Sequence, residues 1–207
     1  MRAIDWKLCL VADTEAAGNR DLLSIIREAV EAGATMIQLR GKNCETRELL
    51  DLAIRISDVS KAQKAPLFIN DRVDVALACG ADGVHLGQQD MPLVHARKLL
   101  GRDRSIGISV NTVAEAQTAE RDGADYIGVG PVYFTSSKDK IPAILGLEGL
   151  RAIREKVRIP ILAIGGITSR NARAVISAGA DGIAVISAIM SEADVREATK
   201  SLVSVLS

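Results

Sequence analysis

Residues 80–90 read Gly80-Ala81-Asp82-Gly83-Val84-His85-Leu86-Gly87-Gln88-Gln89-Asp90 and contain, in order, a connector, a strand and a polar strand end. Glycine just past a helix accepts a left-handed backbone without a Cβ clash, so the connector predicts a turn from a helix directly into a strand. The connector recurs as Gly33-Ala34-Thr35, Gly123-Ala124-Asp125 and Gly179-Ala180-Asp181. The repeated unit is therefore helix-to-strand.

Eight short apolar runs have the composition of strands, at 8–12, 36–39, 66–69, 83–86, 106–109, 126–129, 161–164 and 182–186. Segments with apolar residues at helical spacing lie between them. This alternation predicts a parallel sheet, because parallel neighbours need a crossover connection. An open doubly wound sheet would use the same units. A closed barrel is favoured, because no Gly-x-Gly-x-x-Gly follows the first strand and because the loops after strands seven and eight suit phosphate.

Composition and length bound the class of protein. At 207 residues the chain is long enough for one well-buried domain, so we expect residues 1–207 to form a single α/β domain, a (β/α)8 TIM barrel. Hydrophobic residues make up 48% and aromatic residues 2%, which predicts an aliphatic core around buried parallel strands. The 26 basic and 26 acidic residues cancel, so we expect neither nucleic acid nor a membrane as a partner. The oligomeric state stays open.

The cysteines and the start of the chain indicate a compartment. Cys9, Cys44 and Cys79 are widely spaced without a Cys-x-x-Cys pair, which argues against a disulfide framework or a thiolate zinc site. The first apolar run, residues 8–12, is too short for a signal sequence or a membrane span. We therefore expect an unexported protein of the reducing cytoplasm.

Polar residues follow the predicted strands, and the strand ends of a (β/α)8 barrel open on one face that holds the chemistry. The residues expected on that face are Gln38, Arg40, Lys42, Asn70, Asp71, Asp90, Ser109, Thr135, Ser137, Lys138, Gly165, Gly166 and Ser187. Two carboxylates, three cations and several small donors suit a diphosphate bridged by Mg²⁺. Strand alternation places Gln38 and Arg40 on the same side.

Several of these residues also have a purely structural interpretation. Asp71 and Asp90 could cap the helices expected near Arg72 and Pro92 instead of holding a metal. Ser187 could likewise cap the last helix, and the cations could lie in solvated loops. The residue types alone leave both interpretations open.

One long connection stands out. Residues 132–146 have neither helical nor strand pattern, and such loops inside compact domains are usually functional. Its hydroxyls and Lys138 predict a lid over the site, with a solvated loop as the alternative. Gly165-Gly166 lets backbone N–H groups approach a ligand, beside a helix expected to open near Ser169.

The two histidines carry no recognisable catalytic pattern. We expect His95 on a helix surface and His85 in a packed polar layer of the barrel. The sequence shows no zinc cluster, Ser-His-Asp triad or activated cysteine.

Seven motifs, in order along nearly the whole chain, resemble those of the thiamine phosphate synthase (thiamine-phosphate pyrophosphorylase) family. They are Gln38-Leu39-Arg40-Gly41-Lys42, Asn70-Asp71-Arg72-Val73-Asp74, Gly83-Val84-His85-Leu86-Gly87-Gln88-Gln89-Asp90, Gly107-Ile108-Ser109-Val110, Gly128-Val129-Gly130-Pro131-Val132, Thr135-Ser136-Ser137-Lys138 and Ala163-Ile164-Gly165-Gly166-Ile167. Each motif is weak alone, but seven in sequence are specific.

The resemblance implies a Mg²⁺-dependent transferase that joins the hydroxymethylpyrimidine group of its diphosphate to the nitrogen of a thiazole phosphate. It implies that Asp71 and Asp90 hold Mg²⁺. The residues implied for the pyrimidine diphosphate are Gln38, Leu39, Arg40, Gly41, Lys42, Asn70, Ser109 and Lys138, of which Arg40, Ser109 and Lys138 are also implied as catalytic. Those implied for the thiazole phosphate are Thr135, Ser136, Ser137, Gly166, Ile186 and Ser187. Position 41 is often acidic in the family, and we expect Gly41 to change only loop flexibility.

Two other functions remain in view. A related group of barrels tautomerises a thiazole carboxylate phosphate without diphosphate chemistry, and such an isomerase would need neither Asp90 nor a lid lysine. From another class, the chain could be a barrel that senses a phosphate compound without turnover. Metal-dependent diphosphate release would exclude the sensor.

Overall fold

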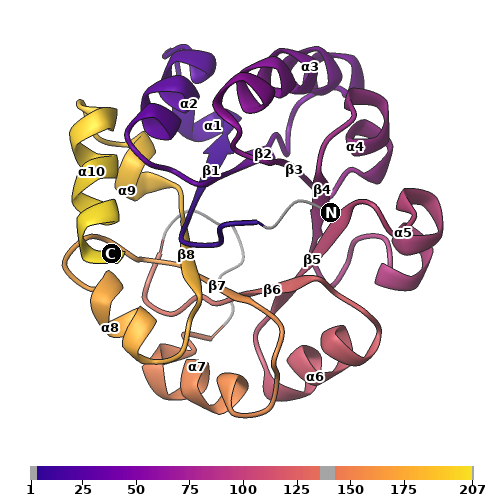
Figure 1. The fold of residues 1–207 in the computed structure, drawn as a ribbon, viewed down its shortest axis with the longest axis vertical. Helices are drawn as coiled ribbons and strands as arrows, with labels where there is room; N and C mark the ends of the chain where they lie inside the picture. Colours follow the sequence, from indigo (N-terminus) through magenta and orange to yellow (C-terminus); the bar gives the residue numbers. More distant parts are fainter. Residues whose placement is uncertain (1–3, 136–142, 207) are drawn as a thin grey trace.

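The computed structural model describes residues 4–135 and 143–206. Its strands close into one barrel in sequence order, each parallel to the next, with β8 returning to β1 (Figure 1). They are β1 (Leu8–Asp13), β2 (Met36–Arg40), β3 (Leu67–Asn70), β4 (Gly83–Leu86), β5 (Ser105–Val110), β6 (Tyr126–Val129), β7 (Ile161–Ile164) and β8 (Gly182–Val185). The (β/α)8 barrel expected from the sequence is confirmed, and the open doubly wound sheet is excluded.

Helices connect the strands and form the outer ring in Figure 1. They are α1 (Thr14–Ala17), α2 (Leu22–Glu31), α3 (Thr46–Gln63), α4 (Val73–Cys79), α5 (Leu93–Leu100), α6 (Val113–Arg121), α7 (Gly146–Arg154), α8 (Ala172–Ser177), α9 (Ser187–Met190) and α10 (Val195–Leu206). The short helix α1 follows directly on β1, and α9 starts one residue after β8, so each begins at the barrel mouth. Each predicted strand end lies within one residue of the observed one.

The helix expected near Ser169 begins later than predicted. The Thr168 N–H donates to Asn171 Oδ1 over 2.8 Å, and Asn171 Nδ2 donates to the Gly166 carbonyl over 3.0 Å. These bonds hold a turn after Gly166, so α8 starts only at Ala172. A side chain that bonds to nearby backbone offers the chain an alternative to the first helical turn.

The inside of the barrel is packed around a small aromatic cluster. The buried residues that form it are Cys9, Val11, Met36, Phe68, Tyr126, Leu162 and Ala184. Inward-facing glycines make room for the rings: a Cβ on Gly107 would lie 2.1 Å from the Tyr126 ring, and one on Gly128 would lie 2.7 Å from the His85 ring. The larger core between strands and helices is aliphatic, as the composition predicts.

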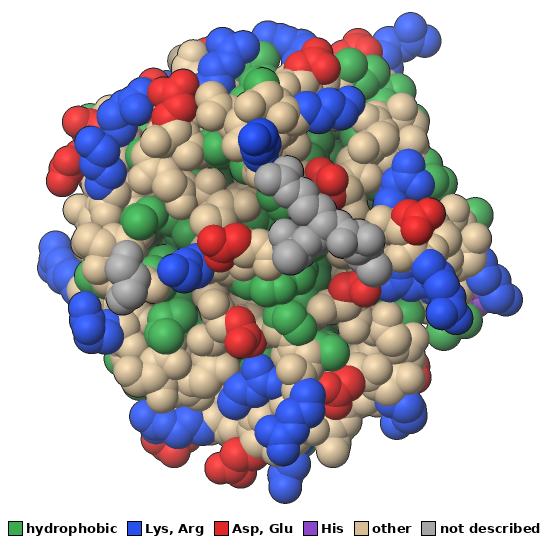
Figure 2. Space-filling view, viewed as in Figure 1, with side chains coloured by type: hydrophobic (Ala, Val, Ile, Leu, Met, Phe, Trp, Pro, Cys, Tyr) green, Lys and Arg blue, Asp and Glu red, His purple; other side chains and the backbone are tan. Residues whose placement is uncertain are grey.

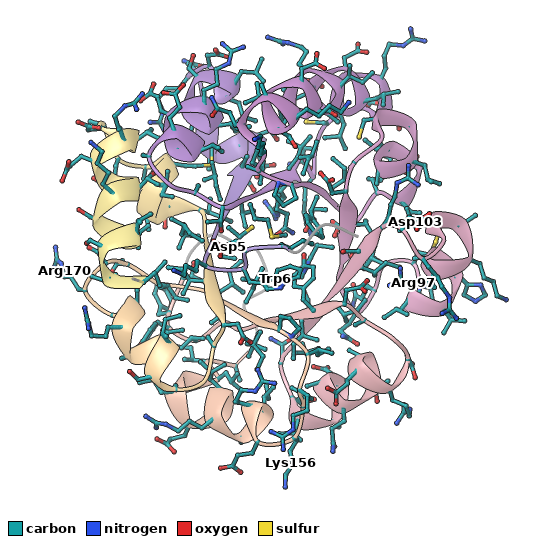
Figure 3. The ribbon with its side chains drawn as sticks, in the orientation of Figure 1. Asp5, Trp6, Arg97, Asp103, Lys156 and Arg170 are labelled. Carbon is teal, nitrogen blue, oxygen red and sulfur yellow. The ribbon has the colours of Figure 1, made fainter. Side chains whose placement is uncertain are left out.

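Trp6 closes the end of the barrel at which the strands begin. Figure 3 shows it in the middle of the ring of strands, next to Asp5. Its ring centroid lies 4.8 Å from that of Tyr126 and 6.4 Å from that of Phe68. Trp6 therefore packs under the aromatic cluster, and the cavity described below lies at the opposite end, where the strands finish.

Gly107→Ala is expected to destabilise the fold, because the new methyl group would overlap the buried Tyr126 ring. Overpacking of this kind typically costs about 1–3 kcal/mol. Denaturant unfolding measures the loss, and in a Tyr126→Leu background the same change should cost much less. An equal cost in both backgrounds would show that the ring is not the obstacle.

The surface agrees with the balanced charge. Figure 2 shows acidic and basic side chains interspersed over the viewed face rather than gathered by sign. Within the described ranges, no helix combines the length and the apolar character needed to cross a membrane.

Candidate active site

A cavity at the ends of the strands brings predicted site residues together. Its lining consists of Val11, Gln38, Arg40, Asn70, His85, Ser109, Tyr126, Gly128, Leu162, Ile164, Ala184 and Ile186. Gln38 and Arg40 face the same cavity, as strand alternation predicts, and Gln38 Nε2 donates to Asn70 Oδ1 over 2.9 Å. Leu39 belongs to the core between strands and helices, so only its backbone can reach a ligand.

Asp71 and Asp90 come together beside this cavity. Burial, followed by the hydrogen bond and the charge of Asp90, raises the pKa of Asp71 to about 7, although the charges of Lys42 and Arg40 act in the opposite direction. Two carboxyl groups this close cannot both ionise easily without a cation. The two carboxylates predicted for the site therefore lie together. The charges of the predicted cations Lys42 and Arg40 act on the pKa of Asp71.

The alternative in which these two acids cap helices is wrong. Helix α4 has Arg72 at its N-cap and α5 has Pro92, and neither helix has a side-chain cap hydrogen bond. Asp90 Oδ2 instead accepts from the Gly87 N–H over 2.6 Å, which turns the loop after β4 back toward the site. Neither carboxylate therefore serves as a helix cap in this structure.

The backbone at Asp71 is held in an unusual conformation. Its φ angle is +64°, in the left-handed region that non-glycine residues rarely adopt. The Arg72 N–H donates to the Asn70 carbonyl over 2.8 Å, and the Asp71 N–H donates to the His85 carbonyl over 2.8 Å. Strained residues kept in place by such bonds cluster at functional sites.

A chain of hydrogen bonds ends at Ser109. The Tyr126 hydroxyl lies 2.9 Å from His85 Nδ1, and His85 Nε2 lies 2.8 Å from Ser109 Oγ. Burial raises the pKa of Tyr126 well above its usual value, so the hydroxyl keeps its proton and can donate it to Nδ1. In the tautomer that matches a Tyr126 donor, His85 carries its proton on Nε2 and donates to Ser109 Oγ, and the Ser109 hydroxyl can then donate to a ligand. His85 is thus buried and polar, as expected, and His95 is exposed on α5.

Tyr126→Phe is expected to lower turnover by about tenfold while the protein stays folded, because His85 loses the donor that fixes its tautomer. Steady-state kinetics together with a melting curve measure both effects. Unchanged kinetics would show that the serine hydroxyl needs no such orientation.

The loop after β2 leaves little space for a side chain at its first residue, Gly41. A Cβ on Gly41 would lie 2.8 Å from Leu49 Cδ1 and 3.0 Å from Cys44 Sγ. A side chain at position 41 therefore changes packing as well as loop flexibility. Lys42, one residue further, is exposed.

The loops after β7 and β8 form the side of the site expected to bind a second phosphate. Gly165 and Gly166 have φ angles of +100° and +63°, and a Cβ on Gly166 would lie 2.4 Å from the Phe134 carbonyl oxygen. Ser187 is the first residue of α9, and Ile186, not Ser187, is its N-cap, so the capping alternative for Ser187 is also wrong. Thr135 is half-buried on the adjoining segment.

Part of the predicted site lies outside the described residues. Ser136, Ser137 and Lys138 fall there, as does the middle of the predicted lid, 132–146. Their roles stay predictions.

Asp13 was not predicted, although it lies at the site. It ends β1, is 3% exposed and forms an ion pair with Arg40. The sequence does contain a signal for Asp13. It is a polar residue directly after the apolar run 8–12, the same pattern that identified site residues at the other strand ends.

The fold and the strand-end cavity place the chain among (β/α)8 barrel enzymes with a polar site at the carboxyl ends of the strands. The family model for thiamine monophosphate synthase matches residues 8–189. The chain belongs to this family.

Individual relatives agree with the family model. A thiamine-phosphate synthase of Clostridium novyi is 48% identical over 98% of this chain and 99% of its own length. One of Chloroflexus aurantiacus is 48% identical over 96% of this chain and 92% of its own. Among solved structures, a thiamine phosphate pyrophosphorylase from Pyrococcus furiosus superposes with a TM-score of 0.89 at 44% identity, over 98% of this chain and 96% of that one.

Proposed function

We propose that this chain is a Mg²⁺-dependent thiamine phosphate synthase, a transferase that moves the hydroxymethylpyrimidine group from its diphosphate to the nitrogen of a thiazole phosphate. Relatives named for this activity match it almost end to end. The observation that carries the proposal is the Asp71–Asp90 pair beside the charges of Arg40 and Lys42. A tautomerase would need no such pair.

The reaction exchanges one bond for another. The bond between the pyrimidine methylene carbon and the diphosphate oxygen breaks, and the electron pair leaves with the diphosphate. The thiazole nitrogen donates its lone pair to the same carbon, so no strong base is needed. Preorganised cations stabilise the charge that accumulates on the leaving group more than they stabilise the bound substrate.

The residues of the site have distinct roles in this proposal. Arg40 and Lys42, with Lys138, bind the diphosphate, while Gln38, Asn70 and Ser109 hold the pyrimidine. The remaining predicted residues, which bind the thiazole phosphate, are Thr135, Ser136, Ser137, Gly166, Ile186 and Ser187. Holding both partners in line converts a bimolecular encounter into a step within one complex. The three free cysteines fit the reducing cytoplasm that we propose as its compartment.

The acidic pair suits Mg²⁺. Among the described residues no cluster of three or more acidic, histidine or cysteine side chains is arranged for a metal, but Mg²⁺ commonly takes one or two carboxylates together with substrate phosphates and water. Asp71 and Asp90 would hold the ion, which when bound neutralises charge on the diphosphate. The cation would also relieve the mutual repulsion of the two acids.

Mg²⁺ affinity is expected to rise with pH and level off above neutrality. Below about pH 7 the Asp71 carboxyl holds a proton, which must leave before the oxygen can bind a cation. Between pH 6 and pH 8 the affinity should increase about tenfold, with proton release on binding. Calorimetry in two buffers of different ionisation enthalpy measures both quantities. A pH-independent affinity would contradict the shared proton.

The direct test of function is to incubate the purified protein with both substrates and Mg²⁺ and to identify the product by mass spectrometry. Thiamine phosphate, formed only when both substrates are present, supports the proposal. A separate reaction with the thiazole carboxylate phosphate alone detects tautomerisation. Isomerisation without thiamine phosphate would replace the synthase by the tautomerase.

A further inference from the structure

Asp13 is a buried acid that none of the family motifs identified above contains. Its Oδ2 pairs with Arg40 Nη1, and its Oδ1 accepts from the N–H groups of Glu15 and Ala16 over 2.9 and 3.0 Å. Both carboxylate oxygens are therefore engaged, one by the start of α1 and the other by a side chain of the site. Because the start of α1 fixes the Asp13 carboxylate, the ion pair also restricts the position of the Arg40 guanidinium.

Arg40 is oriented by this contact. Its side chain is 11% exposed and that of Asp13 is 5% exposed, so neither moves freely in solvent. Asp13 takes one of the five guanidinium N–H donors and leaves the others for a phosphate. Arg40 lines the cavity, pairs with Asp13 and lowers the pKa of Asp71 through its charge, so it interacts with both acids.

Helix α1 also contacts the loop after β2. Glu15 Oε1 accepts from Asn43 Nδ2, and Cys44 Sγ lies 3.5 Å from Thr14 Oγ1. Because Asp13 caps α1, it stabilises the helix that in turn holds this loop. The loop begins directly after Arg40.

A further contact links Asp13 to the other side of the site. The Asp13 N–H donates to Met190 Sδ over 3.2 Å. Met190 is the last residue of α9, and Ser187 is the first. Asp13 therefore touches elements on both sides of the cavity, the one that carries Arg40 and the one that carries Ser187.

We propose that Asp13 is a positioning residue that holds the Arg40 guanidinium where negative charge develops on the departing diphosphate. This inference rests on the proposed function. Asp13 touches Arg40 rather than a substrate, and its negative charge offsets part of the attraction of Arg40 for the bound diphosphate. Arg40 therefore stabilises the bound substrate less than it stabilises the transition state, and this difference raises kcat.

The test uses Asp13→Ser, because serine still caps α1 but is too short to reach Arg40. Asp21→Ser is the matched control, since Asp21 caps α2 with contacts to Leu23 and Ser24 but pairs with no site residue. We expect kcat to fall about tenfold or more in Asp13→Ser, with no rise in KM for the pyrimidine diphosphate. Inorganic diphosphate with Mg²⁺ should bind at least as tightly as to wild type, and the control should keep wild-type kinetics.

A double-mutant cycle separates positioning from a general effect on the fold. In an Arg40→Ala background, Asp13→Ser should lower kcat no further. A wild-type kcat in Asp13→Ser, or an equal loss in both backgrounds, would overturn the positioning role. Asp13→Asn, measured in the same way, replaces the serine variant if that does not fold. Absence of turnover in the wild type would instead overturn the proposed function.

Discussion

Asp71→Asn will lose activity by about 100-fold or more while the protein becomes slightly more stable at pH 8. Asparagine tolerates the left-handed backbone but binds a cation poorly and carries no charge to repel Asp90. The folded state raises the Asp71 pKa, so ionising this carboxyl opposes folding, and the cost grows as the pH rises from about 4 to about 7 and stays constant above that. Removing that cost should add on the order of 1 kcal/mol, or roughly 2–4 °C in Tm.

Asp74→Asn is the matched control for this prediction. Asp74 lies three residues away, pairs with Arg72 at the surface and has its pKa lowered by that hydrogen bond. Its substitution should leave activity unchanged and stability equal or slightly lower. Melting curves at pH 5 and pH 8 complete the comparison, because the gain in Asp71→Asn should shrink at pH 5, where the wild-type carboxyl is protonated. A loss of stability at pH 8 would contradict the repulsion between Asp71 and Asp90.

Arg40→Ala will lower both kcat and stability. Loss of a preorganised donor to a developing negative charge typically costs about 100- to 1,000-fold in kcat. The same change leaves Asp13 buried without its partner, which typically costs about 3–5 kcal/mol. Kinetics and denaturant unfolding measure the two effects separately.

The two effects should separate in the double variant. Adding Asp13→Ser to Arg40→Ala should restore most of the stability without restoring kcat, because the unpaired buried charge is gone but the guanidinium is not replaced. Arg97→Ala serves as the control for losing an arginine ion pair: Arg97 pairs with Asp125 on the outer wall, where Figure 3 shows it on α5. That variant should lose stability and keep its kcat. A double variant as unstable as Arg40→Ala would show that the ion pair is not the source of the loss.

The barrel was predictable because its signal is local and repeated. Gly80, Gly123 and Gly179 each mark a helix end, and the apolar runs that follow match the observed strands to within one residue. The start of α8 was missed because Asn171 bonds back to Gly166 and Thr168, a competition with helix formation that periodicity does not register.

The site was predictable where polar residues follow strands in recognisable motifs, as at Arg40 and Asp71. Whether Asp71 and Asp90 cap helices or face each other depends on the fold, because local sequence permits both. Asp13 acquires its role from Arg40, 27 positions away, and Tyr126 from a histidine on another strand. Such pairings arise only when the barrel closes.

The proposed synthase function requires metal-dependent departure of diphosphate. We would measure diphosphate release from the purified protein with both substrates, with and without Mg²⁺, beside an Asp90→Ala variant of verified fold. We expect release that requires both substrates and the metal, and that is lost in the variant. Equal release without Mg²⁺, or from Asp90→Ala at the wild-type rate, would contradict it.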